Sequence, residues 1–266
     1  TDKIIVATSK PPASGKDVSD SSGNSLMERY GITVSDLEHI RKMDNVETVS
    51  VARNARRKIL SGMKRLDLSL VGVSTDFLSF SRSEIVQGRW LSPIDGITNN
   101  CVIGSNVRRQ LFSLGEKNIV GSTIMIERDI FRIVGIAENL YGTNIPGIGS
   151  PNDCIFITIM ASDSIFGKKA YDTSSRNATV EDVDFDTFII RVRDVSYIDY
   201  TSKRISSYMT KLHSETKDWT MLVPLDLLKQ QEQTQNIFTI VMSSIAGISL
   251  LVGGIGIMNI MLANVY

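Results

Sequence analysis

The sequence contains few of the side chains that carry metal and redox chemistry: two cysteines and two histidines among 266 residues. Cys101 and Cys154 are too far apart for a CxxC redox or zinc motif. His39 and His213 stand at no metal-ligand spacing from each other or from a cysteine. We therefore expect no metal site, and we expect both histidines to be solvated or half packed on helices.

The two cysteines each open a short apolar run, "CVIG" and "CIFI", that is typical of a strand. Two buried free thiols are the simpler interpretation, because cysteine packs as a small hydrophobic side chain. A disulfide is the alternative if the compartment is oxidising. A chain of this length has apolar material for a full core, so we expect neither cysteine to be essential for folding.

A surplus of charge of either sign is also lacking. Lys and Arg total 29, Asp and Glu total 29, and the isoelectric point is about 6.7. A balanced chain has no general attraction for the phosphate backbone of nucleic acids. We expect no nucleic-acid partner.

Catalytic and nucleotide-binding motifs are the third group that is missing. The sequence has no Walker A motif, and "SGMK" (Ser61 to Lys64) matches a serine acyl-enzyme pattern without its usual companion motifs. "GGIG" (Gly253 to Gly256) lies in an apolar run and does not follow a strand, as a dinucleotide site requires. The acidic stretch "VEDVDFD" is typical of a solvated loop. We expect no catalytic residue and no cofactor.

No leader sequence opens the chain, because "TDKIIVATSK" starts directly with strand-like alternation. The chain is expected either to begin inside a longer protein or to be cytosolic. Residues 10–25 are rich in Pro, Gly, Ser and Asp, which predicts a loop.

Two strand, helix, strand patterns frame the sequence. The first covers residues 3–52, with a helix over 33–43 that places Leu37 on its apolar face. The second covers residues 185–223. Its helix carries one apolar stripe, formed by Ile198, Ile205, Met209 and Leu212. We predict that residues 3–8 and 185–193 lie in one sheet.

Between the two patterns the sequence is rich in short strands. The predicted class is α+β, with a discontinuous subdomain of residues 1–75 and 181–224 and an inserted β-rich subdomain of residues 76–180. The stretches 141–153 and 168–182 are predicted loops.

Three local signals define element ends. Thr33 or Ser35 is the expected N-cap of the first helix, with Glu38 completing a capping box from Ser35. Ser105 is expected to cap a short helix that Gly115 ends. A hairpin over residues 122–137 is expected to turn at Arg128 and Asp129.

The last part of the chain lacks charge completely. From Gln233 to Tyr266 there is no Asp, Glu, Lys, Arg or His, and Ile237 to Ala263 would span roughly 40 Å as a helix. That length exceeds a hydrocarbon core and disfavours the alternative, a buried helix of a soluble protein. Residues 225–266 are therefore a predicted stalk and transmembrane helix, continuous from Leu225. Small or polar residues for helix packing are Ser243, Gly247, Ser249, Gly253, Gly254, Gly256 and Asn259.

Several stretches together resemble one family. "SSIAGISLLVGGIGIMNIMLANV" is similar to the second membrane helix of MacB/FtsX-type ABC transporter permeases. "VGVSTDFLSF", "VQGRWLSPID" with "CVIGSNVRRQLF", and "VGSTIMIERDIFRIVGI" resemble successive signatures of the MacB-like periplasmic core domain. Two positions depart from the pattern: Arg128 and Asp129 replace a Gly-containing turn, and Tyr266 stands where Thr or Ser commonly precedes a charged coupling segment.

The resemblance implies the extracytoplasmic domain of a permease that exports a substrate from the periplasm by mechanotransmission. ATP would be hydrolysed in a partner or fused ABC nucleotide-binding domain, and this chain would itself lack an ATPase site. The family's discontinuous porter-like part and inserted sabre-like part correspond to the two subdomains predicted above. The implied location is the inner (cytoplasmic) membrane, with residues 1 to about 230 on the periplasmic side.

The implied partners are the ABC ATPase, a second copy or paired permease, and a periplasmic adaptor with an outer-membrane duct. Two alternatives stay open at this point. The chain could belong to a lipoprotein-release or cell-wall-hydrolase-activating permease of the same family. It could also be a membrane-anchored sensor or binding module that has no ATPase partner.

Overall fold

The structure is a computed structural model of the whole chain, and it describes residues 3–9, 27–29, 31–62, 64–96, 98–113, 119–166, 170–172, 179–182, 184–213 and 218–263. The predicted loop over residues 10–25 lies outside these ranges, as does Gly115.

The strands, in chain order, are β1 (Lys3–Thr8), β2 (Met27–Arg29), β3 (Val46–Ser61), β4 (Lys64–Val73), β5 (Glu84–Gly88), β6 (Asn100–Gly104), β7 (Thr123–Ile126), β8 (Asp129–Glu138), β9 (Cys154–Thr158), β10 (Ala170–Asp172), β11 (Thr179–Asp182), β12 (Thr187–Val192) and β13 (Trp219–Leu222). The helices are α1 (Val34–Arg41), α2 (Phe77–Ser81), α3 (Ser105–Leu111), α4 (Ile159–Phe166), α5 (Ile198–Leu212) and α6 (Pro224–Ala263), with short 3₁₀ turns η1 (Pro93–Gly96), η2 (Pro151–Asp153) and η3 (Val195–Tyr197).

Nine of the strands form one path in the order β13-β1-β12-β3-β4-β9-β6-β8-β5, and β7 pairs with β3 and β8 beside it. A separate small sheet has the order β10-β11-β2. Strands β10 and β11 fall within residues 168–182, so the predicted loop there contains a hairpin.

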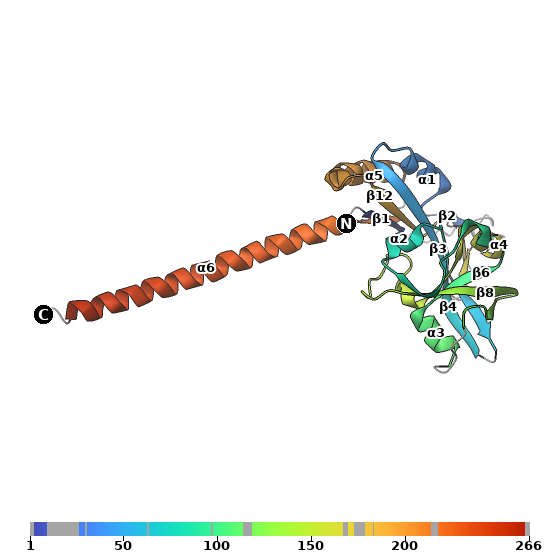
Figure 1. Cartoon of the computed structure of the whole chain (residues 1–266). Helices are drawn as coiled ribbons and strands as arrows, with labels where there is room; N and C mark the ends of the chain where they lie inside the picture. Colours follow the sequence, from blue (N-terminus) through green and yellow to red (C-terminus); the bar gives the residue numbers. More distant parts are fainter. Residues whose placement is uncertain are drawn as a thin grey trace, which may run out of the picture. The chain divides into compact units, whose positions relative to one another are not determined.

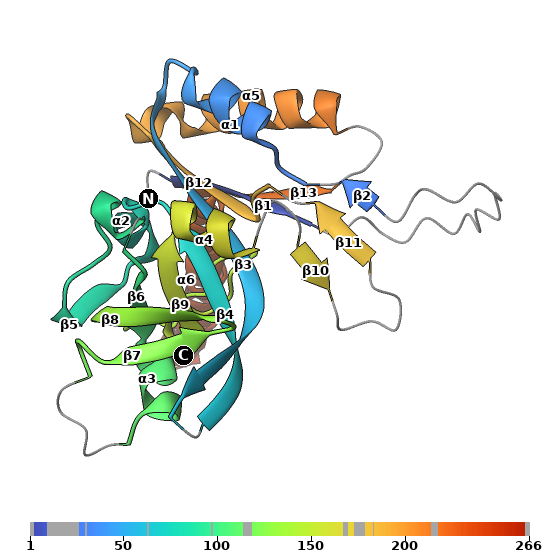
Figure 2. The same ribbon diagram turned by 90° about the vertical axis from the view of Figure 1, so that its right-hand side faces the viewer.

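The first four strands of the path, β13, β1, β12 and β3, come alternately from the two predicted strand, helix, strand units. β1, α1 and β3 form one split βαβ unit, and β12, α5 and β13 form the other. β1 pairs antiparallel with β12, from Lys3↔Arg191 to Ala7↔Thr187, so the two segments predicted to share a sheet do so. Figure 2 shows α1 and α5 together on one face of these strands. Both helices bury apolar residues, including Leu37 in α1 and Ile205 in α5.

Strand β3 is 16 residues long, and this length lets it join the strands of the split βαβ units to those of the inserted segment. Its first half pairs with β12 and its second half with β4. Ile59 of β3 and Leu70 of β4 belong to the same buried cluster as Ile103 of β6 and Phe131 of β8. The sheet is therefore continuous between the outer and inserted segments, and residues 2–222 form one compact unit. The subdomain boundaries at 75 and 181 stay a prediction.

The motif "VQGRWLSPID" folds around an ion pair between half-exposed Arg89 and buried Asp95. Arg89 donates from Nη1 and Nη2 to the two carboxylate oxygens of Asp95, at 2.7 and 2.8 Å. Asp95 is fully buried and also accepts from the Asn100 side chain and from the backbone N–H of Ser92. The Arg89 hydrogen bonds are the main cause that holds the pKa of this carboxyl well below its usual range.

Four local predictions need correction. The capping box of α1 joins Thr33 to Asp36, and Ser35 and Glu38 take no part in it. The N-cap of α3 is Gly104, so Ser105 is the first helical residue.

The hairpin of β7 and β8 turns at Glu127 and Arg128, one residue earlier than predicted, with Glu127 at φ 53°. Leu212, at the last position of α5, is 59% exposed and does not join the buried stripe of Ile198, Ile205 and Met209. The 3.6-residue period predicts which face of α5 is apolar, but it does not show how far along the helix that face is covered by the sheet.

Helix α6 is a unit by itself. Its 40 residues begin at Pro224, a residue favoured at the first helical position, and run without a break (Figure 1). Residues Thr234–Met261 are long and apolar enough to cross a membrane, and the most apolar part is fully unburied in this chain. The predicted start near Leu225 is confirmed to within one residue.

Candidate functional site

Strand β13 is the last element before α6, and a single residue, Val223, separates the two in sequence. β13 lies at the edge of the large sheet and pairs with β1 from Thr8↔Trp219 to Ile5↔Leu222. The contacts of β13 therefore determine how firmly the segment before α6 is attached to the domain.

Asp218, directly before β13, is fixed by its backbone and its side chain. Its carbonyl oxygen accepts from the Ser9 N–H at 2.7 Å, and its Oδ2 accepts from the Gly31 N–H at 2.6 Å. The residue is only 1% exposed. Gly31 has φ +88°, and a Cβ there would clash with the Thr8 side chain, so this close approach requires glycine.

His213 connects Asp218 to a second buried carboxylate. Its Nδ1 lies 3.0 Å from Asp218 Oδ1, and its Nε2 lies 3.3 Å from Asp36 Oδ2. The His213 side chain is 11% exposed and both carboxylates are 2% exposed. We call Asp36, His213 and Asp218 the aspartate–histidine cluster. It joins α1, the C-cap of α5 and the start of β13.

Asp36 is also held by its own helix and by α5. Its Oδ2 accepts from the backbone N–H and the hydroxyl of Thr33, at 2.8 and 2.7 Å. Its Oδ1 accepts from the Tyr208 hydroxyl at 3.3 Å. Burial, and then the charge of Asp36, raises the pKa of Tyr208. His39 stacks on the Tyr208 ring at 4.0 Å.

The chemistry of the cluster depends on the proton count of its imidazole. A neutral ring carries one N–H, so only the protonated ring presents a proton to both carboxylates. The contact between Nδ1 and Asp218 Oδ1 is close but not a well-aligned hydrogen bond, and this oxygen has no hydrogen-bond partner among the described residues. The arrangement is a buried electrostatic connection between helices and strand.

Both histidines fall within the expected range of burial. His39 is exposed on α1. His213, the C-cap of α5, has intermediate burial, and its side chain is 11% exposed. Asp36 and Asp218 were not predicted, because they lie 177 and 5 residues from His213 and only the fold brings them together.

The other predicted residues are placed as follows. Cys101 and Cys154 are both buried and free, on the adjacent strands β6 and β9. Ser61 and Lys64 are paired at the β3–β4 hairpin, where Lys64 Nζ donates to the Gln110 carbonyl. The predicted packing positions lie on α6: Ser243, Gly247, Ser249, Gly253, Gly254, Gly256 and Asn259. At its four glycines an added Cβ would meet no atom within 4 Å, and their role in helix packing stays a prediction.

Comparison with known proteins identifies the family. Residues 2–208 match the model of the MacB-like periplasmic core domain. The macrolide export ATP-binding/permease protein MacB of Wolinella succinogenes is 29% identical over 86% of this chain and 33% of that protein. The pyoverdine export ATP-binding/permease protein PvdT of Pseudomonas aeruginosa is 30% identical over 73% of this chain and 27% of that protein. The chain thus spans about a third of the length of these relatives.

Two solved structures share the fold. The periplasmic region of MacB from Actinobacillus actinomycetemcomitans matches with a TM-score of 0.58 at 14% identity, over 88% of this chain and 93% of that one. The extracellular domain of the transporter YknZ from Gram-positive bacteria matches with a TM-score of 0.56 at 12% identity, over 83% of this chain and 100% of that one. The chain belongs to the MacB-like periplasmic core domain family of MacB/FtsX-type ABC transporter permeases.

Proposed function

We propose that this chain transmits ATP-driven motion from the cytosol to an extracytoplasmic domain, and that this motion exports a substrate from the periplasm. The observation that carries the proposal is the junction: α6 starts one residue after β13, and β13 is attached by a strand ladder and by Asp218. A displacement of the helix end would reach the sheet with only Val223 to absorb it.

The composition of α6 supports a stiff connection. Kinks in helices occur mostly at proline, at glycine or serine pairs, or at bulges. Residues 225–242 contain neither proline nor glycine nor serine, and Pro224 is the first helical residue. The stretch that would join the domain to the bilayer is therefore free of the usual bending points.

The aspartate–histidine cluster would transmit a force on β13 to several elements of the domain. A pull on β13 acts on β1 through the ladder, on α5 through His213 and on α1 through Asp36. The domain would then move as one body, because α1 and α5 both cover the part of the sheet that contains β1 and β12 (Figure 2).

ATP hydrolysis is assigned to a nucleotide-binding domain outside this chain, either fused or separate. The relatives are ATP-binding/permease proteins and this chain matches about a third of each. The location would be the inner membrane, with residues 1 to about 230 in the periplasm. A second copy, a periplasmic adaptor and an outer-membrane duct would complete the assembly. The export names of the relatives favour this function over lipoprotein release, hydrolase activation or sensing.

The test is an insertion of Gly-Gly after Gln233 in the full transporter. Each helix-interior glycine costs about 1 kcal/mol relative to alanine, and two added residues rotate everything beyond them by roughly 200°. The matched control replaces Gln233 and Thr234 by alanine, which keeps the length and the helix. Retained ATP hydrolysis with lost transport in the insertion variant supports the proposal. Normal transport in that variant would show that α6 is only an anchor.

A further inference from the structure

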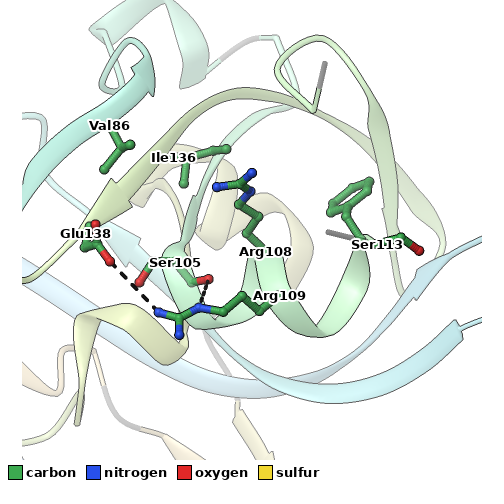
Figure 3. A pocket seen from close by; sticks show the side chains of 8 residues that line it. Val86, Ser105, Arg108, Arg109, Ser113, Ile136 and Glu138 are labelled. Atoms are coloured by element: carbon green, nitrogen blue, oxygen red, sulfur yellow. Dashed lines mark hydrogen bonds and ion pairs between the residues drawn. The ribbon is translucent and has the colours of Figure 1, made fainter. Parts of the chain in front are cut away.

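A pocket of about 250 Å³ lies between α3 and strands β5 and β8, in the inserted segment (Figure 3). Its walls include Val86 of β5, Glu138 of β8 and four residues of α3 or just after it, Ser105, Arg108, Arg109 and Phe112. The volume is just below the range of roughly 300–1,000 Å³ typical of ligand pockets, so a ligand here has to be small.

The charge of the pocket is positive on balance. Arg109 is engaged, since its Nε donates to the Ser105 carbonyl at 3.4 Å and its Nη2 lies 4.0 Å from Glu138 Oε1. The side chain of Arg108 makes no hydrogen bond or ion pair with any residue that the structure describes. Its guanidinium therefore keeps all its donors for a ligand, in the planar arrangement that matches a carboxylate.

A second polar group in the pocket lacks a partner. Ser105 is 7% exposed, and its hydroxyl makes no hydrogen bond to the described part of the chain. Buried hydroxyls are nearly always hydrogen-bonded, because leaving one unsatisfied is costly. Figure 3 shows this hydroxyl on the pocket side of α3, toward Glu138 and away from the helix backbone.

Apart from Ser113, the remaining walls are apolar. Val86 is 57% exposed on the edge strand β5, and Phe112 is only partly covered by the core. Ile136 of β8, which is 1% exposed, forms the apolar floor beside Arg108 (Figure 3). A fully hydrated inorganic anion would leave these side chains facing water.

We propose that this pocket binds a small organic anion that has a carboxylate head and a short branched or cyclic apolar body. Arg108 holds the carboxylate, the Ser105 hydroxyl donates a second hydrogen bond, and the apolar body covers Val86 and Phe112. The proposal stands independently of mechanotransmission, because it depends only on the inserted segment.

The experiment uses the whole chain in lipid nanodiscs and isothermal titration calorimetry. The probe is 3-methylbutanoate, with 3-methylbutanamide as the neutral analogue of equal shape and inorganic phosphate as the anion without an apolar body. We expect saturable binding of the acid and at least tenfold weaker binding of both others. Equal binding of the amide, stronger binding of phosphate, or no binding of the acid would overturn the proposal.

Three substitutions at two positions locate the site. Arg108→Gln should weaken binding of the acid about tenfold or more, and Ser105→Ala about threefold. The matched control, Arg128→Gln, removes an exposed arginine from the turn before β8 and should leave binding unchanged. Arg108→Lys keeps the charge but loses the two-pronged contact, so it should weaken binding severalfold even if Arg108→Gln fails to fold. Unchanged affinity in folded Arg108→Gln or Arg108→Lys would place the ligand elsewhere.

Discussion

The Nδ1 atom of His213 lies 3.0 Å from Oδ1 of Asp218, which joins the C-cap of α5 to the residue that precedes β13. The same ring reaches Asp36 on α1 through its other nitrogen. The segment that leads to α6 is thereby tied to both helices of the split βαβ units.

Removal of the imidazole should destabilise the domain. His213→Gln removes the ring that contacts both buried carboxylates, and a buried polar group left without its partner costs roughly 1–3 kcal/mol. We expect the free energy of unfolding of residues 1–222, measured with urea at pH 7, to fall by about 2 kcal/mol. His39→Gln is the control, and its exposed side chain should cost less than about 1 kcal/mol.

A double substitution tests whether the cluster acts as a unit. The double variant Asp36→Asn/His213→Gln removes both the Asp36 carboxylate and the imidazole that contacts it. The combined loss should therefore be smaller than the sum of the two single losses, by about 1 kcal/mol or more. Simple additivity in urea unfolding would show that the two residues are energetically independent.

The lowered pKa of Asp95 predicts how the free energy of unfolding depends on pH. Its pKa is lowered in the folded state, chiefly by Arg89, so the group binds fewer protons folded than unfolded. Its contribution is complete above the unfolded pKa of about 3.9 and is lost as the pH falls below that value toward the folded pKa.

Asp95→Asn should therefore cost about 2 kcal/mol at pH 7 and flatten the loss of stability below about pH 4. The measurement is urea unfolding of residues 1–222 between pH 7 and pH 2.5, with the exposed Asp129→Asn as control. An acid loss as steep in Asp95→Asn as in the unaltered domain would contradict the assignment.

The two thiols should be unreactive in the folded domain. Burial raises the pKa of Cys154 to about 12 and shifts that of Cys101 upward as well, so almost no thiolate is present at neutral pH. We expect maleimide to label neither residue until urea unfolds the domain. Replacement of both by alanine should cost about 1 kcal/mol each and leave the domain folded at 25 °C. Fast labelling of the native domain would argue for local opening around β6 and β9.

A charge in the middle of α6 should impair its insertion. Leu250 lies within Thr234–Met261, and an arginine at the centre of a membrane helix costs roughly 2.5–3.5 kcal/mol in apparent insertion free energy. Leu250→Arg should move a large share of the protein out of the membrane fraction. Leu140→Arg, at a site that is 67% exposed in the extracytoplasmic domain, should leave membrane integration unchanged.

The sequence predicts best what depends on composition and on short periods. The charge-free stretch identified α6, and alternation in residues 3–8 and 187–192 identified two strands that do pair. Capping was less certain, because both Thr33 and Ser35 precede acidic residues at the right spacing. The structure selects Thr33, since Asp36 is the residue that also faces Tyr208 and His213.

Contacts between particular side chains that are distant in the sequence were not predictable. Periodicity treats each strand separately, so it does not show that β3 runs for 16 residues from one part of the sheet into the next. It likewise gives no signal for His213, whose partners are defined by the packing of α1 against α5 and β13. The pocket beside Arg108 depends on β5, β8 and α3 meeting, which one sequence does not specify.

The most direct test of the account is the distance between the two copies of the domain that we propose for the full transporter. A spin label at Arg128→Cys reports this distance, because Cys101 and Cys154 are buried and should not be labelled. Double electron–electron resonance in nanodiscs would compare the nucleotide-free and ATP-bound states. We predict that ATP shifts the distance distribution when α6 is unaltered and leaves it unshifted when Gly-Gly follows Gln233, although ATP is still hydrolysed. An equal ATP-dependent shift in both proteins would show that the motion does not pass through α6.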